Sequence, residues 1–271
     1  MPKFKFSVLL PIYYREKPEY FRLALKSIED QTLLPDEIVI VKDGKLPDEL
    51  DEIIDEFNLR LPCKIVSIPI NVGLGEALHI GIKECSHDFV ARMDSDDICV
   101  AERFEKQAAA FQNDPELDIS GSYLREFIYK PDDLGIIRRV PLDHSEIYRY
   151  TFYRCPFNHP TVMFRKKTVM EAGSYQKMPF FEDYYLWIRM VVGGCKLHNS
   201  PEVLLHYRIG NNMISRRHGI NYAINELSFF AFCYRKGLIS LPQLVVFSSR
   251  FPIRLMPMGM LGKFYKVILR K

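Results

Sequence analysis

The alternation of short apolar runs with helical patterns over the first hundred residues most limits how this chain can fold. Four runs rich in β-branched and aromatic residues are expected to be buried strands, at residues 4–10, 38–41, 64–68 and 89–93. Amphipathic helical patterns separate them, at residues 18–28, 46–57 and 75–84. This order predicts an α/β fold with a mostly parallel twisted sheet and helices on both faces.

The chain is long enough for one compact unit with an appended segment. It has 271 residues, no internal repeat and no low-complexity tract. Its six cysteines show no C-x-x-C pair and no His/Cys ligand spacing, which indicates reduced thiols in a cytoplasmic protein. The first apolar run ends at Pro11, too soon for a signal peptide, and is typical of a first strand.

Polar residues follow each predicted strand, at the edge where an open parallel sheet binds its ligands. They form four clusters, at residues 11–14, 43–44, 71–75 and 94–97. The Asp-Gly pair at 43–44 is by itself common turn chemistry. Residues 71–75 match neither G-x-G-x-x-G nor the P-loop pattern, which disfavours a redox dinucleotide or a P-loop site.

Three aspartates lie within residues 94–97, directly after the fourth predicted strand. Side chains alternate along a strand, so Arg92, Asp94 and Asp96 are expected on one side, with Asp97 turned away. Two adjacent carboxylates favour a divalent cation, and oxygen ligands favour Mg²⁺ or Mn²⁺. The alternative is a solvated acidic turn in which Asp97 caps a helix over residues 100–111.

The second half contains two more candidate sites. Glu182 and Asp183 are expected at the start of a buried helix over residues 180–190, either as caps that complement the helix dipole or as a general base. His159, in the stretch Asn-His-Pro, is either a hydrogen-bonding structural residue or a functional one. These observations leave both alternatives open.

The order and spacing of these motifs resemble family 2 glycosyltransferases of bacterial polysaccharide synthesis, including O-antigen and capsule enzymes. The resemblance covers roughly residues 5–217. It rests on SVLLPIYYREKPEYFRLALKSIEDQTLLPDEIVIVKDG, NVGLGEALHIGIKECSHDFVARMDSDD, AERFEKQ, HPTVMFRKKTVMEAGSY, EDYYLWIRM and PEVLLHYRIGNNMISRR. It implies the GT-A fold, which is Rossmann-like, and an inverting hexosyltransferase.

The resemblance also implies roles for single residues on the donor side. The nucleotide-sugar, with UDP as the expected nucleotide, would be bordered by Pro11, Tyr13, Asp43 and Arg92. The segment Asp94, Ser95 and Asp96 would be the D-x-D motif that holds Mn²⁺ or Mg²⁺ against the donor diphosphate, with Asp96 as the preferred direct ligand and Asp94 as the second. His79 and Lys42 depart from the family pattern and put nearby donor contacts in question.

On the acceptor side, the resemblance implies that Asp183 is the base that deprotonates the acceptor hydroxyl. Glu182 is its neighbour or substitute, and adjacency in sequence does not rank the two. His159 and Arg208 match positions that would meet the acceptor or the donor phosphate. The reaction would be an inverting displacement that joins the sugar to a saccharide hydroxyl.

The chain is expected to divide at residue 225. Residues 1–225 would form the glycosyltransferase domain, with a nucleotide-sugar half at 1–100 and an acceptor half at 101–225. Residues 227–271 contain eight Lys and Arg and no acid, interleaved with bulky apolar residues. A helical segment over 226–271 would suit an anionic membrane surface, at the cytoplasmic face of the inner membrane, and an acceptor linked to polyprenyl diphosphate. The alternative is a helical subdomain that packs on the core or on a second subunit.

Other classes are less compatible with these motifs. A sugar nucleotidyltransferase would need a glycine-rich, Arg-containing loop after Leu10, which the chain lacks. Nucleic acid is not an expected partner, because no binding motif accompanies the basic tail. A non-catalytic nucleotide- or sugar-binding protein on the same fold stays open, since only turnover separates it from an enzyme.

Overall fold

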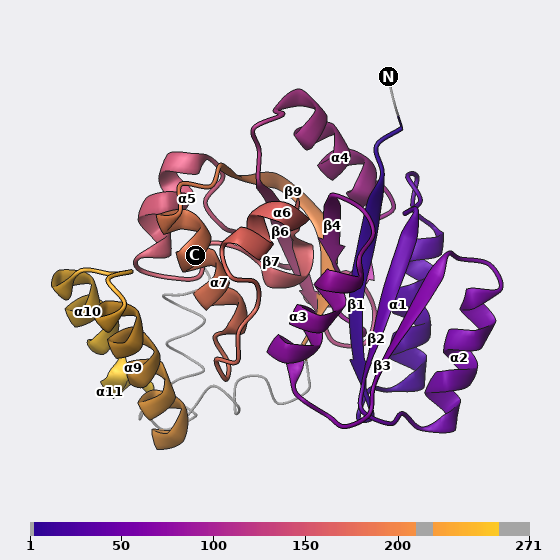
Figure 1. The fold of residues 1–271 in the computed structure, drawn as a ribbon, viewed down its shortest axis with the longest axis horizontal. Helices are drawn as coiled ribbons and strands as arrows, with labels where there is room; N and C mark the ends of the chain where they lie inside the picture. The colour runs from indigo at the N-terminus through magenta and orange to yellow at the C-terminus, as the bar shows by residue number, and fades with distance from the viewer. Residues whose placement is uncertain (1–2, 210–218, 255–271) are drawn as a thin grey trace.

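A single sheet organises the protein in the computed structural model, which describes residues 3–209 and 219–254 (Figure 1). Within these residues the sheet has nine strands, and β7 (Ile136–Arg138) pairs with β6 alone. The other eight run in the order β3 (Cys63–Ile68), β2 (Glu37–Asp43), β1 (Phe6–Tyr13), β4 (Phe89–Arg92), β8 (Met163–Arg165), β6 (Ile119–Phe127), β9 (Leu197–Arg208) and β5 (Ile98–Cys99).

The first four strands confirm the predicted parallel arrangement. β1 pairs in parallel with β2 and β4, and β2 pairs in parallel with β3. The connections are α1 (Pro18–Glu29), α2 (Asp48–Asn58) and α3 (Leu74–Glu84), close to the predicted helices. Such crossovers place the carboxyl ends of the strands along one edge.

The first strand is longer than expected. β1 continues to Tyr13, so Pro11 and Tyr13 lie within the strand and not after it. β1 pairs with β4 only as far as Leu9, which leaves Pro11 with a single neighbouring strand, β2. A proline without an amide hydrogen is tolerated at such a half-paired position.

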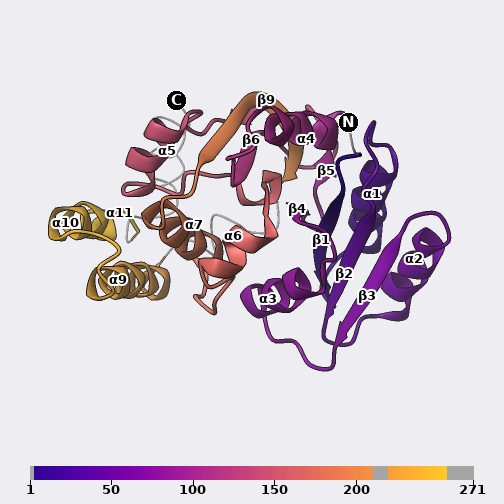
Figure 2. The same cartoon turned by 45° about the horizontal axis from the view of Figure 1, so that its top comes forward.

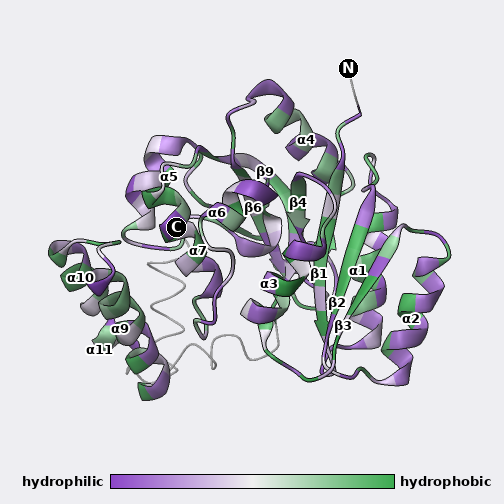
Figure 3. Cartoon of the chain, in the orientation of Figure 1, coloured by the Kyte–Doolittle hydropathy of each residue, from purple (hydrophilic) through white to green (hydrophobic). Residues whose placement is uncertain are grey.

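Alternation along the central strands divides the interior into two layers. Phe6, Val8 and Leu10 of β1 face α1, α2 and α4 (Arg103–Asn113), whereas Leu9 faces α3 on the opposite side. β1 and β2 are hydrophobic along most of their length, and the helices outside them alternate between hydrophobic and hydrophilic residues (Figure 3). Burial of both faces of these strands explains their continuous apolar runs in the sequence.

The second half completes the sheet with antiparallel and parallel pairs. β8 runs antiparallel to β4 and β6, and β6 runs parallel to β9 with a bulge near Tyr123. β5 pairs with β9, so the residues just after the aspartate cluster are joined to the end of the second half. The other elements here are α5 (His144–Thr151), the 3₁₀ turn η1 (His159–Thr161), α6 (Lys166–Glu171) and α7 (Glu182–Val192).

The alternative in which Asp97 caps a helix is wrong. α4 begins at Arg103, with Glu102 at the N-cap and no side-chain cap. The short strand β5 intervenes, because its pairing with β9 takes residues 98 and 99 into the sheet. Asp97 is instead fully buried beside β9, where it accepts a hydrogen bond from Arg208.

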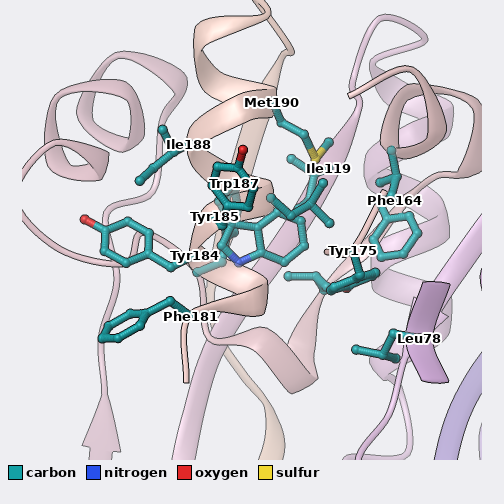
Figure 4. Packing of buried hydrophobic residues seen from close by; sticks show 14 of the residues in the cluster. Leu78, Ile119, Phe164, Tyr175, Phe181, Tyr184, Tyr185, Trp187, Ile188 and Met190 are labelled. Atoms are coloured by element: carbon teal, nitrogen blue, oxygen red, sulfur yellow. The ribbon is translucent and has the colours of Figure 1, made fainter. Parts of the chain in front are cut away.

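α7 is buried by an aromatic layer, which Figure 4 shows around Trp187. The indole of Trp187 lies edge-on to Tyr175, at 6.4 Å between ring centroids. α9 (Ile220–Arg235) covers α7, and the Phe229 ring stacks on that of Phe181 at 4.7 Å. α7 begins at Glu182, which confirms the expectation that Glu182 and Asp183 lie at the start of this helix.

The C-terminal helices extend to one side of the molecule, as the 45° rotation in Figure 2 also shows. They are α9, α10 (Leu241–Ser248) and α11 (Phe251–Arg254). α9 packs on the core, as the alternative for the basic tail anticipated, whereas residues 255–271 lie outside the described part. In the ranges that the structure describes, no helix combines the length and hydropathy of a membrane span.

Candidate active site

Arg92, the last residue of β4, is the buried centre of the candidate site. Its side chain is fully buried, pairs with the Asp94 carboxylate and donates to the carbonyl oxygen of Met93. The Nε atom of Arg92 is buried without a hydrogen-bond partner among the described residues. A buried guanidinium beside a strand end supplies fixed positive charge where a phosphate-bearing ligand would bind.

The carboxylates after β4 crowd one another. Burial, and then the charges of Asp94 and Glu16, raise the pKa of Asp96 to about 7, while Arg208 opposes the rise. Ser95 donates its hydroxyl hydrogen to Glu16, which follows the end of β1. Glu16, which the sequence motifs did not single out, thus adds a carboxylate from the loop after β1 to those that follow β4.

Arg208 lies at the same place and contacts the segment formed by residues 94–97. Its backbone amide donates to Asp97 Oδ1 at 2.8 Å, and its Nε donates to the Asp96 carbonyl oxygen at 2.9 Å. The guanidinium is buried over the rings of Tyr20 and Phe127, 3.8 and 4.4 Å from their centroids. Arg208 therefore holds residues 94–97, the aspartate segment, in position.

Asp43 is the last residue of β2, the strand next to β1. Its carboxylate is buried and accepts hydrogen bonds from Asn71 Nδ2 at 2.9 Å and from the amides of Val72 and Gly73 at 2.7 and 3.0 Å. The fit is close, since a Cβ on Gly44 would lie 2.9 Å from the Asn71 nitrogen. Asp43 fixes the 71–73 loop against the end of β2.

Asp183 and His159 approach the site from the second half. His159 lies 3.2 Å from the hydroxyl of Tyr175, and burial followed by the charge of Arg92 lowers the pKa of His159. Burial raises the pKa of Tyr175, Arg92 opposes the rise, and the charges of Asp183 and Asp94 add to it. Tyr175 thus lies within electrostatic reach of both aspartates, which links the start of α7 to the end of β4.

Glu182 faces a different neighbour from Asp183. Its side chain lies against Gly75 of α3, where a Cβ added to the glycine would come within 2.7 Å of Glu182 Cγ. Burial, and then the charge of Asp183, raise the pKa of Glu182 to about 7. The structure therefore separates two adjacent acids that the sequence could not rank.

Comparison with known proteins identifies the chain's family. The model of glycosyl transferase family 2 matches residues 7–173, which is more than half of the chain. The chain belongs to glycosyltransferase family 2. This glycosyltransferase is 38% identical over 268 residues to the UDP-Gal:alpha-D-GlcNAc-diphosphoundecaprenol beta-1,3-galactosyltransferase of Escherichia coli, covering 98% of this chain and 97% of that one.

Two further comparisons agree with this family. The glycosyltransferase is 42% identical over 227 residues to the amylovoran biosynthesis glycosyltransferase AmsE of Erwinia amylovora, covering 83% of this chain and 84% of that protein. Among solved structures, the mannosyltransferase PcManGT from Pyrobaculum calidifontis, in complex with GDP-Man and Mn²⁺, is similar with a TM-score of 0.68. That match covers 98% of this chain and 77% of the other at 16% identity, so it shows the shared GT-A fold.

In this glycosyltransferase, Asp94 and Asp96 would supply part of the ligand set of a divalent metal ion. Within the described ranges, no group of three or more His, Cys, Asp or Glu side chains is arranged to hold a metal ion. Asp94 and Asp96 nevertheless offer only oxygen ligands. Burial is the largest cause of the raised pKa of Asp96, and a cation would offset the neighbouring charges of Asp94 and Glu16 that add to it. The remaining ligands would come from the donor or from water.

Three further residues near the candidate site are Tyr13, Lys42 and Tyr175. Tyr13, at the end of β1, is 39% exposed and packs edge-on against Tyr14. Lys42 pairs with Asp51 of α2 and turns away from Asp43. Tyr175 was not expected from sequence, because a tyrosine in a loop between α6 and α7 carries no local signal of its contact with His159.

Proposed function

We propose that this glycosyltransferase moves a hexosyl group, with inversion, from a UDP-sugar to a hydroxyl of a lipid-linked saccharide during surface polysaccharide synthesis. The observation that carries the proposal is the ion pair of the buried Arg92 with Asp94 at the carboxyl end of β4, in a chain that belongs to glycosyltransferase family 2. The relative from E. coli, whose name includes UDP-Gal and diphosphoundecaprenol, supports the donor and the acceptor class. Residues 1–225 would form the transferase domain, with the donor half at 1–100.

In the proposed reaction Asp183 accepts the proton of the acceptor hydroxyl. The oxygen attacks the anomeric carbon, and a C–O bond forms while the bond to the donor diphosphate breaks on the opposite face. The nucleoside diphosphate leaves with its electron pair. Asp183 suits this role because it is an acid in the first turn of α7, within electrostatic reach of Tyr175.

The donor would lie along the carboxyl ends of β1, β2 and β4. Pro11, Tyr13 and Asp43 would border its nucleoside, and Arg92 would supply positive charge toward the diphosphate. Asp94 and Asp96 would hold Mn²⁺ or Mg²⁺, with Ser95 between them. A bound divalent ion would neutralise charge on the leaving diphosphate. His159, hydrogen-bonded to Tyr175, would face the acceptor side.

The test is sugar transfer from UDP-galactose to a synthetic GlcNAc-diphospho-lipid with Mn²⁺ present. Asp183→Asn keeps the size of the side chain but removes the base, so we expect turnover to fall by about 10³-fold or more. Retained turnover in Asp183→Asn would contradict its role. Nucleotide binding without transfer to any lipid-linked saccharide would favour the non-catalytic alternative, and nucleotidyl transfer would favour a sugar nucleotidyltransferase.

We also propose that α9 and α10 rest on the cytoplasmic face of an anionic membrane. Apolar side chains point outward one turn apart, with Ile220 and Ile224 about half exposed on α9, and Leu241 and Val245 at 56 and 62% exposed on α10. The one acid on α9 and α10, Glu226, is buried and pairs with Arg254, and residues 227–271 carry no acid. Apolar side chains with surrounding positive charge are typical of interfacial helices.

Vesicle flotation tests the membrane contact. Val245→Glu should reduce binding to phosphatidylglycerol-containing vesicles, because it places a carboxylate in the acyl boundary. Leu59→Glu is the matched control, since Leu59 is 87% exposed just after α2. Equal binding of both variants and the unmodified protein would contradict the proposed surface.

A further inference from the structure

Gly75 and Glu182 form a steric contact between two halves of the site. A Cβ on Gly75 would lie 2.7 Å from Cγ of Glu182 and 3.1 Å from the carbonyl oxygen of Gln176. Real side chains do not approach so closely, so glycine is required for the Glu182 stem to rest on the first turn of α3. The start of α7 is therefore seated directly on the start of α3.

The first turn of α3 is itself fixed to the end of β2. The amides of Val72 and Gly73 donate to the Asp43 carboxylate at 2.7 and 3.0 Å. Gly73 then opens the helix with φ of +89°, a conformation that favours glycine. Only one residue separates Gly73 from Gly75, so the position of the Asp43 end of the loop sets the position of Gly75.

The other side of the α7 start is held by α9. The Phe181 ring stacks on Phe229 with an interplanar angle of 5°. Phe180 adopts a left-handed φ of +71°, which a bulky side chain rarely does and which surrounding packing must maintain. The first turn of α7, which contains Asp183, is therefore held between α9 and α3.

We infer that Glu182 is a positioning residue, which transmits the position of the 71–75 loop to Asp183 through its contact with Gly75. The inference rests on the proposed function, in which Asp43 borders the donor and Asp183 is the base. Donor binding at the Asp43 end would then align the base on the far side of the site. The contact is made by the methylene stem of Glu182, so the carboxylate charge is not required for it.

A double-mutant cycle tests this inference. Gly75→Ala inserts the clashing Cβ, so we expect kcat to fall about tenfold or more, because small displacements of a catalytic group are costly. The Kd for UDP should change less than about threefold. Glu182→Ala removes the 2.7 Å contact and leaves only the 3.1 Å contact with the Gln176 carbonyl oxygen, so Gly75→Ala should have a much smaller additional effect in that background. Glu182→Gln keeps the stem and should retain most of the wild-type kcat.

Gly81→Ala is the matched control on the same helix. Its Cβ would lie 2.5 Å from side-chain atoms of Leu9 and Val41, which is equally crowded but faces the sheet. We expect a loss of stability that Glu182→Ala does not relieve. Additive effects of Gly75→Ala and Glu182→Ala, or a wild-type kcat in folded Gly75→Ala, would overturn the inference. Because the cycle is measured relative to an active wild type, these outcomes differ from a failure of the proposed function, in which the wild type itself shows no transfer.

Discussion

The backbone amide of Arg208 donates a 2.8 Å hydrogen bond to Oδ1 of Asp97, and this bond ties the loop after β4 to the last residue of β9. The Arg208 side chain adds a second bond, from Nε to the Asp96 carbonyl oxygen. Both Arg208 and Asp97 are buried. The aspartate segment is thus held in place from the second half of the chain, and its geometry does not depend on β4 alone.

Replacing Asp97 should distinguish the loss of this acceptor from the loss of charge. Asp97→Ala leaves the Arg208 amide unsatisfied and should lower the free energy of unfolding by about 2 kcal/mol or more. Asp97→Asn keeps an acceptor oxygen and should cost about 1 kcal/mol or less. Urea unfolding measures both, and equal losses in the two variants would mean that the hydrogen bond is not what holds the segment.

Removing the Asp96 charge should abolish metal-dependent nucleotide binding. UDP with Mn²⁺ at roughly a hundredfold excess over Kd should raise the melting temperature by about 5 °C, since it binds only the folded protein. In Asp96→Asn we expect no additional rise when Mn²⁺ accompanies UDP. Asp55→Asn, an exposed aspartate on α2, serves as the control and should behave as wild type. A full Mn²⁺-dependent rise in Asp96→Asn would argue against Asp96 as a ligand.

Asp43→Asn should release the 71–73 loop. The asparagine has one acceptor oxygen where the carboxylate accepts three hydrogen bonds, so unfolding should become easier by about 1 to 3 kcal/mol. UDP affinity should fall with it. The neighbouring Lys42→Ala removes only a surface ion pair with Asp51 and should cost about 1 kcal/mol or less. Similar losses for the two variants in urea unfolding would contradict this account.

Glu182 should make stability depend on pH. Its folded pKa of about 7 is above its ordinary value of 4.5, so the native state holds the proton more tightly than the unfolded state. Wild-type stability should therefore fall as pH rises from about 4.5 to 7 through this group. Relative to wild type, Glu182→Gln should gain about 1 to 2 kcal/mol between about pH 5 and pH 8, after allowance for partial solvent screening. Parallel stability profiles in urea unfolding at the two pH values would contradict the raised pKa.

The first half of the fold was predictable because its signals are local. Buried parallel strands are apolar on both faces, and three amphipathic helices separate them. The spacing of apolar residues and the residue composition were therefore sufficient to predict these strands and helices. The Glu-Asp pair was likewise expected at the start of a helix, and α7 begins there. The end of β1 was missed, since only the limited length of β4 makes Pro11 acceptable in the strand.

The second half carries weaker signals. β9 contains His198, Asn199 and Pro201, and its pairing with β6 is interrupted by a bulge. Its apolar residues therefore follow neither the strand pattern nor the helical pattern closely. The buried contact of Arg208 with the aspartate segment was not predictable from the sequence, because residue 208 is far from residues 96 and 97 in the chain. The contact of Glu182 with Gly75 of α3 was equally invisible, because the two residues are distant in sequence.

The pairing of β5 with β9 also sets the order in which the site can be completed during synthesis. β1 to β4 can associate once residue 92 has left the ribosome, and by residue 97 every predicted donor-side residue has been made. Asp97 finds its hydrogen-bond partner only when residue 208 emerges. A nascent chain or a proteolytic fragment that ends before this point would contain the predicted donor motifs in an unformed loop. The enzyme would thus complete its proposed donor site only after residue 208 has been made, when most of the proposed acceptor half, residues 101–225, is already present.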